Sequence, residues 1–273
     1  MSSLTSDLPL AGLRVLVTRA RDQAGPLVEE LRGLGATPVE LPAIEIAPAP
    51  LGPLDAALAR LGGYDWLIFT SVNGVRACFE RLRALGGDPA GVRASIGAIG
   101  RATAEAVRSY GAAVAFVPER FVAESAVEGL VARGMAGQRV LLPRADIARE
   151  TLPEGLRAAG AWVDVVVAYR TLPVDDIDPA LLDELRRDRF DVLTFASPST
   201  VRSVAALLGA TRPRHGVVAC IGPITAEAAR KAGFRVDIQA DEYSMPGLTR
   251  ALTRWRAAFD ERTSAVDDDE DSR

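Results

Sequence analysis

The chain has 273 residues, of which 48% are hydrophobic and 25% charged, and its formal net charge at pH 7 is −4. The acid run at 267–273 accounts for that charge, so residues 1–266 are neutral. A chain of this length predicts about two domains with enough apolar residues for their cores. A neutral body has no basic field to attract a polyanion, so we expect no nucleic-acid binding.

Few side chains are suited to metal binding or nucleophilic catalysis. Cys78 and Cys220 lie far apart without metal-ligand spacing, and we expect buried, reduced thiols. His215 is the single histidine, and its neighbours Arg214 and Gly216 predict an exposed loop. These features argue against a histidine-dependent triad and a histidine-rich metal site. No secretion signal is visible and no apolar run approaches the roughly 18 residues of a membrane span, so we expect a cytoplasmic protein without membrane segments.

Short apolar runs alternate with amphipathic segments along the chain. In order, we predict a strand at 15–17, a helix at 22–34, strands at 37–41 and 66–69, a helix at 75–85, a strand at 95–99 and a helix at 103–110. Ser71 or Asn73 can cap the helix at 75–85. Regular alternation of strand and helix favours parallel sheets with helices on both faces.

The second half of the chain repeats the first. The matching blocks are Arg14–Ala20 with Arg139–Ala145, Tyr64–Arg76 with Phe190–Arg202, and Ile99–Ala106 with Ile221–Ala228. A repeat this long suits two similar domains rather than a solenoid. Two facing domains form a cleft, which is where we expect a ligand to bind.

Two segments at equivalent places in the repeat, residues 43–48 and 167–172, interrupt the alternation of strand and helix, and prolines follow each of them. We interpret them as extended crossings between domains that end where prolines prevent further pairing. The predicted division is a discontinuous domain 1 at 1–43 and 173–258, domain 2 at 49–167, and crossings at 44–48 and 168–172. Periodicity is lost after Trp255, which predicts a disordered acidic tail at 259–273.

Four strand-to-helix turns carry hydroxyl or amide side chains. In parallel sheets such turns lie at the carboxyl ends of strands, where free helix N–H groups favour carboxylates or phosphates. Ordinary helix capping explains any one turn alone, but four turns in two facing domains favour an anion-binding cleft. The candidate substrate-binding residues in them are Ser71, Asn73, Thr103, Ser197, Ser199 and Thr225.

Three further side chains are candidates. Arg19 and Arg144 end equivalent strands and can pair with substrate carboxylates, although surface ion pairs would also explain them. Tyr169 lies in the second crossing and would face the cleft, although a packed aromatic with a satisfied hydroxyl is the alternative. The segment 97–100 lacks the full glycine pattern of a dinucleotide-binding loop.

The ordered blocks together resemble the uroporphyrinogen-III synthase family over roughly residues 12–255. The residues that carry the resemblance are Val17-Thr18-Arg19, Asp65 to Val75, Ile99-Gly100 with Thr103-Ala104, Val140 to Arg144, Tyr169 with Thr171, Phe195 to Ser199, and Ile221-Gly222-Pro223 with Thr225-Ala226. The resemblance implies two flavodoxin-like α/β domains with parallel sheets, joined by a two-stranded linker ladder. It also implies family site positions at Thr103, Tyr169, Ser197 and Thr225.

The implied activity is a cyclising hydro-lyase that needs no cofactor or metal. Its substrate would be hydroxymethylbilane, a linear tetrapyrrole with eight carboxylates, closed to uroporphyrinogen III with inversion of ring D and loss of water. We expect Tyr169 to assist departure of the hydroxyl as the catalytic residue. We expect a monomer, and a transient contact with hydroxymethylbilane synthase is compatible with the sequence although no residue indicates it.

The competing interpretation is a bilobed protein that binds a small molecule without chemistry. Such a sensor would share the repeat and the cleft, but it would usually bring an output module, and the repeat leaves no room for one. A periplasmic solute receptor would need a signal peptide.

Overall fold

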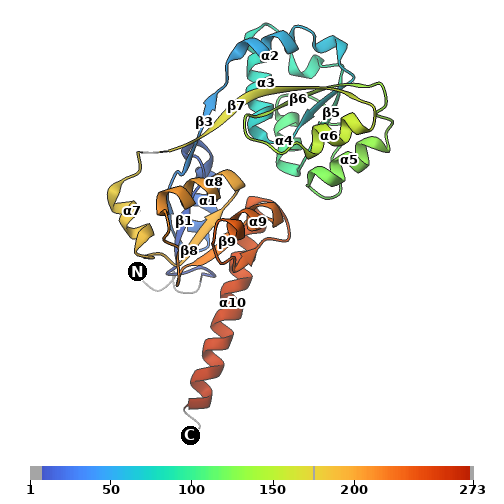
Figure 1. Cartoon of the computed structure of the whole chain (residues 1–273). Coiled ribbons are helices and arrows are strands. Elements are labelled where there is room, and N and C mark those ends of the chain that lie inside the picture. The colour runs from blue at the N-terminus through green and yellow to red at the C-terminus, as the bar shows by residue number, and fades with distance from the viewer. Residues whose placement is uncertain (1–7, 175, 271–273) are drawn as a thin grey trace. The chain divides into compact units, whose positions relative to one another are not determined.

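The computed structural model describes residues 8–174 and 176–270, with 262–270 described as backbone only. It divides into unit 1 (Met1–Glu45 and Leu172–Arg273) and unit 2 (Ile46–Thr171), both shown in Figure 1. The chain passes between the units at 45–46 and 171–172, which lie within the crossings expected at 44–48 and 168–172.

Strands and helices alternate through most of the described chain. The strands are β1 (Arg14–Val17), β2 (Thr37–Glu40), β3 (Ile44–Pro48), β4 (Trp66–Phe69), β5 (Ser95–Ala98), β6 (Arg139–Ala145), β7 (Trp162–Pro173), β8 (Val192–Phe195), β9 (Val217–Cys220) and β10 (Ile238–Gln239). The helices are α1 (Arg21–Gly33), α2 (Leu51–Leu58), α3 (Val72–Ala84), α4 (Arg101–Ser109), α5 (Ala123–Val131), α6 (Thr151–Ala158), α7 (Pro179–Arg186), α8 (Pro198–Leu208), α9 (Pro223–Lys231) and α10 (Met245–Glu270).

Unit 1 contains a five-stranded sheet in the order β10-β9-β8-β1-β2, and every neighbouring pair is parallel. Strand β1 pairs with both β2 and β8, so the first βαβ unit shares a sheet with the C-terminal third of the chain. Helices α1 and α10 cover one face, and α7, α8 and α9 cover the other. Burial on both faces explains why residues 15–17 of β1 are a continuous apolar run.

Unit 2 contains a five-stranded sheet in the order β3-β7-β6-β4-β5, in which β7, β6, β4 and β5 are parallel. By the sequence repeat, β6 corresponds to β1 and β4 to β8, so these four strands have the order β2-β1-β8-β9 of unit 1. A parallel bridge from Gly97 to Phe116 lies where β10 lies in unit 1. Because the chain reaches β4 before β6, unit 2 is a circular permutation of unit 1.

The core of unit 2 lies on both faces of its sheet. In β4, Leu67 and Phe69 pack with α2, α3 and α4, whereas Ile68 packs with α5 and α6 on the opposite face. Successive strand residues point to opposite faces, so a strand covered on both sides is apolar throughout. Helix α3 begins at Val72, earlier than the predicted 75, because Ser71 is its N-cap.

The C-terminal end of the described chain differs from the expectation. Helix α10 continues to Glu270 (Figure 1), which contradicts the disordered tail predicted at 259–270, while 271–273 lie outside the described residues. Alanine and arginine are strong helix formers, and Arg256 pairs with Asp260 one turn later at 3.0 Å. The apolar periodicity is lost after Trp255, but the helix continues. Within the described residues, no helix is long and apolar enough to span a membrane.

Candidate functional site

The carboxyl edge of the unit 2 sheet gathers five of the candidate residues. Tyr169 lies near the end of β7, Arg144 near the end of β6, Ser71 and Asn73 after β4, and Thr103 after β5. These four strands are parallel, so their carboxyl ends meet at one edge of the sheet. Residues far apart in the sequence are thereby brought to the same side of unit 2.

Tyr169 and Ser71 are in direct contact at this edge. The Tyr169 hydroxyl lies 3.0 Å from Ser71 Oγ, and it also hydrogen bonds with the Asn73 side chain. Ser71 Oγ in turn accepts the backbone N–H of Gly74 at 3.1 Å, which fixes Ser71 as the N-cap of α3. A capping serine therefore also positions the tyrosine, so capping and site formation are combined in one residue.

Tyr169 is buried, with 8% of its surface exposed, and this burial raises the pKa of its phenol. Asp146 raises that pKa further, while hydrogen bonds from Ser71 and Asn73 oppose the rise. The phenol is therefore protonated at neutral pH and available as a hydrogen-bond donor. Either hydroxyl can be the donor in the contact between Ser71 and Tyr169, and when Ser71 donates, the phenol proton is left for another acceptor.

A β-bulge turns Tyr169 toward the face of the sheet that packs with α2, α3 and α4. Arg144 pairs with Val167 and Ala145 with Tyr169, so Ala168 is an extra residue on β7. In a regular strand, Tyr169 would share the face of Val167, which is exposed. The bulge breaks that alternation, and bulges commonly redirect a side chain next to an active site.

Asp146, which follows β6, fixes β7 beyond this bulge. Its backbone N–H donates to the Tyr169 carbonyl at 3.1 Å, and its Oδ1 accepts the backbone N–H of Thr171 at 3.1 Å. Arg170 Nε lies 3.7 Å from the other carboxylate oxygen. Sequence reasoning missed Asp146, because the only signal available was an acidic residue directly after the Val140–Arg144 block.

The Arg144 guanidinium is engaged within its own loop. Its side chain is almost fully buried, and it donates to the Arg149 carbonyl at 3.0 Å and to the Glu150 carboxylate. Its Nε is buried without a hydrogen-bond partner among the described residues. Arg144 thus lies at the expected edge, but its guanidinium holds the loop at 146–150 rather than standing free for a ligand.

The turn before α4 is open at its N-terminus. Gly100 is the N-cap, with φ of 111° and no side-chain cap, a conformation that favours glycine. Thr103 is buried in the first turn, where its hydroxyl donates to the Ile99 carbonyl at 3.3 Å. Because no side chain caps α4, its first backbone N–H groups suit an anionic ligand better than the Thr103 side chain does.

Unit 1 has the equivalent pair of turns at its own carboxyl edge. Ser197 caps α8 by accepting the Thr200 N–H at 3.3 Å, and Ser199 accepts from Arg202 at 3.0 Å. Thr225 is buried in the first turn of α9, whose N-cap has no side-chain hydrogen bond. Each unit therefore pairs one serine-capped helix with one helix that lacks a side-chain cap.

Arg19 lies in the loop after β1 of unit 1. It is half-buried and donates to Gln23 at 3.2 Å. Burial lowers the pKa of its guanidinium, and the nearby Asp22 carboxylate partly restores it. A half-buried guanidinium beside a strand end is well placed to attract a carboxylate.

The remaining chemistry-bearing residues are the two cysteines and the single histidine. Cys78 and Cys220 are buried free thiols, as predicted, and His215 is exposed. Within the described residues, no group of three or more His, Cys, Asp or Glu side chains is arranged to hold a metal ion.

Known proteins match this arrangement over most of its length. A family model described as uroporphyrinogen-III synthase HemD matches residues 25–250. The chain belongs to the uroporphyrinogen-III synthase family. The uroporphyrinogen-III synthase of Synechococcus elongatus is 34% identical over 259 residues, covering 92% of this chain and 98% of that protein. The putative uroporphyrinogen-III synthase of Methanothermobacter thermautotrophicus is 32% identical over 246 residues, covering 86% and 96%.

A solved structure shows the same fold. The crystal structure of a mutant uroporphyrinogen III synthase from Thermus thermophilus aligns with a TM-score of 0.61 and 24% identity, covering 89% of this chain and all of that one. The family and the α/β fold with parallel sheets predicted from the sequence are thereby confirmed. Membership of the uroporphyrinogen-III synthase family makes the chain a cyclising lyase of porphyrin biosynthesis.

Proposed function

We propose that the chain closes hydroxymethylbilane to uroporphyrinogen III. The terminal hydroxyl leaves as water, the chain end attacks through a spirocyclic intermediate, and ring D is inverted before closure. Hydroxymethylbilane closes without a catalyst to the wrong isomer, so the enzyme must control geometry more than supply a strong acid. Holding reacting groups in place can contribute up to ~7–11 kcal/mol in favourable cases.

The contact between Tyr169 and Ser71 carries this proposal. A protonated phenol held by hydrogen bonds with Ser71 and Asn73 can direct its proton to the departing hydroxyl when Ser71 donates to the phenol oxygen. Because its pKa is raised, Tyr169 assists by hydrogen bonding in preference to full proton transfer. Assistance of this kind requires a positioned donor rather than a strong acid.

The turns at the carboxyl edges are proposed to hold the acetate and propionate groups of the substrate. The N-termini of α4 and α9 offer backbone N–H groups, and their positive dipole ends favour carboxylates. Arg19, Ser197 and Ser199 add donors in unit 1. Arg144 is assigned a supporting role, because its guanidinium holds the loop beside Tyr169.

We also infer that both units are flavodoxin-like and that β3 and β7 form the two-stranded ladder linking them. The strand order β10-β9-β8-β1-β2 is the 2-1-3-4-5 order of flavodoxin-like folds, read from its far edge. Strand β3 is the neighbour of β7, and the chain passes between the units within these two strands. Both facts support the ladder.

Product-isomer analysis tests the proposed reaction. Hydroxymethylbilane is incubated with the full chain, the products are oxidised, and uroporphyrins I and III are separated. Mostly isomer III, against mostly isomer I in the blank, is the expected result. Isomer I alone from folded protein would refute the reaction and favour a binding protein without chemistry.

A further inference from the structure

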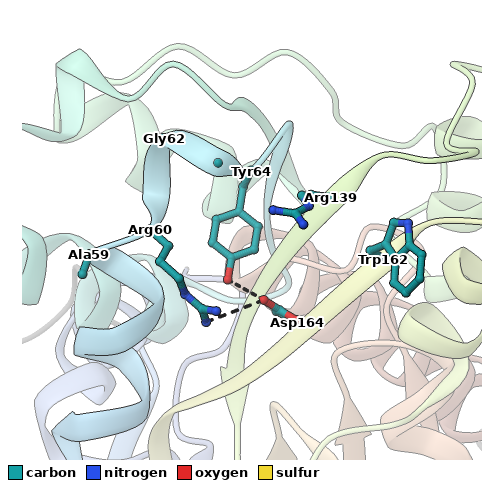
Figure 2. A pocket seen from close by; sticks show the side chains of 8 residues that line it. Ala59, Arg60, Gly62, Tyr64, Arg139, Trp162 and Asp164 are labelled. Atoms are coloured by element: carbon teal, nitrogen blue, oxygen red, sulfur yellow. Dashed lines mark hydrogen bonds and ion pairs between the residues drawn. The ribbon is translucent and has the colours of Figure 1, made fainter.

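A pocket lies at the opposite, amino edge of the unit 2 sheet (Figure 2). Its volume is about 510 Å³, within the ~300–1,000 Å³ range of small-molecule sites. Trp162 and Tyr169 lie on the same strand, roughly 23 Å apart at ~3.3 Å per residue. The proposed reaction therefore does not use this pocket. Its lining residues are Ala59, Arg60, Gly62, Gly63, Tyr64, Arg139, Trp162 and Asp164.

One acid in the pocket is already partnered. Asp164 accepts a hydrogen bond from the Tyr64 hydroxyl at 2.6 Å, and Arg60 lies 3.9 Å from the same carboxylate (Figure 2). Burial, followed by this hydrogen bond, raises the pKa of Tyr64 to about 12, so its phenol stays protonated. By contrast, no ion pair joins the Arg139 guanidinium to a carboxylate in the part of the chain that the structure describes. The charged side chains that line the pocket are Arg60, Arg139 and Asp164, so the lining carries one net positive charge, and Asp65 contacts Arg139 only through its backbone N–H, at 2.7 Å.

Trp162 presents a large apolar surface beside this charge. It is 72% exposed, the highest exposure among the large hydrophobic side chains of the described residues. An indole ring left in water forgoes the free energy that burial would give, so it offers apolar area that a ligand can cover. A planar ring and a guanidinium side by side suit a ligand that is both aromatic and anionic.

The repeat in unit 1 shows that the fold does not need this tryptophan. Strand pairing places Thr37 at the position of Trp162, and Val39 at the position of Asp164. Unit 1 forms the same parallel pair of strands with a small polar residue and an apolar residue at these positions. Trp162 and Asp164 are therefore additions beyond what the strand requires.

Two further pocket side chains, Tyr64 and Arg139, differ from their counterparts in unit 1 in chemistry or in pairing. Phe190 replaces Tyr64 in the repeat, so the hydroxyl is absent. Arg14 corresponds to Arg139, but its guanidinium lies 2.7 Å from Glu184 and is neutralised. Three of these positions add a polar or aromatic group in unit 2, and at the fourth the arginine is kept but lacks the ion-pair partner that Arg14 has. Together they distinguish this pocket from the pocket that Arg14 and Phe190 line at the same edge of unit 1.

We propose that this pocket binds an aromatic carboxylate about the size of one pyrrole ring with its acid side chains. The ring lies against the Trp162 indole, and a carboxylate pairs with Arg139. The aromatic and anionic class follows from these two residues alone. That the ring is a pyrrole rests on the proposed function, which makes pyrrole carboxylates the chemistry available to this enzyme.

Binding to the full chain tests the proposal without an activity assay. Binding is followed by NMR through the indole N–H resonances, of which the chain has three because it has three tryptophans. The resonance of Trp162 is assigned as the one that disappears in Trp162→Thr, which introduces the residue that unit 1 has at this position. A monopyrrole with acetate and propionate groups is titrated, with citrate as a non-aromatic polyacid. We expect the chemical shift of the Trp162 indole N–H to change saturably on addition of the monopyrrole and not on addition of citrate. By calorimetry, Trp162→Thr should abolish binding and Arg139→Gln should weaken it about tenfold or more.

Arg108→Gln, at an exposed arginine outside the pocket, is the matched control and should leave affinity unchanged. No saturable shift, an equal shift with citrate, or unchanged affinity in Trp162→Thr would overturn the proposal. Failure of the proposed reaction would instead appear as isomer I in the product assay. The two failures are therefore distinguishable.

Discussion

The backbone N–H of Asp146 donates to the carbonyl of Tyr169 at 3.1 Å, directly after the bulge in β7. The Asp146 carboxylate then accepts the N–H of Thr171, so one residue holds the strand on both sides of Arg170. A catalytic side chain acts best when its supporting contacts fix it before the substrate arrives. Asp146 is therefore a positioning residue for Tyr169.

Substitution of Asp146 should reduce turnover through this positioning. Asp146→Ala is expected to lower kcat several-fold and the free energy of unfolding by about 1–2 kcal/mol, because the backbone N–H of Thr171 loses its acceptor. Asp146→Asn keeps an acceptor oxygen and should restore most of kcat. Asp88→Ala is the control, since Asp88 also accepts a backbone N–H, at 3.0 Å, but in an exposed turn. Equal kcat loss in both alanine variants would refute the positioning role.

Substitutions of Arg144 and of Glu150 should have the same, non-additive effect on activity. If Arg144 acts by holding the loop, Arg144→Gln and Glu150→Gln should lower kcat/KM in the same direction, with no additional loss in the double variant. Glu150 is half exposed, so we expect a stability cost of only about 1–2 kcal/mol for its loss. Steady-state kinetics on the three variants provide the test. A large rise of KM confined to Arg144→Gln would show instead that Arg144 contacts the substrate directly.

Gly100 should be needed for its backbone conformation. At φ of 111° and ψ of 151°, a Cβ would meet only Thr103 Oγ1, at 3.9 Å, so space is available but the backbone is strained. Gly100→Ala should therefore cost about 1–3 kcal/mol in urea unfolding and raise KM. Gly33→Ala, at the end of α1 with nothing within 4 Å of its Cβ, should instead stabilise by roughly 0.5 kcal/mol. Similar stability changes at both glycines would contradict this account.

The two buried thiols predict how stability depends on alkaline pH. Burial raises the pKa of Cys78 and of Cys220 to about 12. Above about pH 9 the unfolded thiols ionise while the folded ones stay protonated, so the free energy of unfolding falls by up to ~1.4 kcal/mol per pH unit for each thiol. Cys78→Ala should remove one share of that slope between about pH 9 and 11. Rapid alkylation of either thiol in the native protein at about pH 8 would show that it is not buried.

The alternation of strands and helices and the internal repeat could be predicted from the sequence because both depend on local patterns. Apolar runs such as 66–69 and caps such as Ser71 have signatures in neighbouring residues. The permuted order of unit 2 was implicit in the repeat, since the block at 139 matches the block at 14. These features predicted the family and the edge at which most candidates lie.

What the sequence could not show depends on pairing between distant segments. The bulge at Ala168 appears only when β7 is aligned with β6, and it decides which face Tyr169 occupies. The partner of Arg144 depends on the loop that follows it, so the sequence alone left both a substrate carboxylate and an ion pair open, and the structure pairs Arg144 with Glu150. The sequence alone does not show that Trp162 and Thr37 occupy equivalent strand positions, and this equivalence is what makes their difference evidence for the pocket.

The most direct test of the account compares isomer III formation by the wild type, Tyr169→Phe and Tyr110→Phe. Tyr110 is the control because its hydroxyl bonds only weakly to Glu80, at 3.3 Å on the surface. We predict that Tyr169→Phe lowers kcat roughly tenfold to a hundredfold and the free energy of unfolding by only about 1 kcal/mol, the cost of one lost hydrogen-bonding hydroxyl, and that Tyr110→Phe leaves kcat unchanged. Wild-type turnover and isomer III yield in Tyr169→Phe would contradict the assignment of Tyr169 as the catalytic residue.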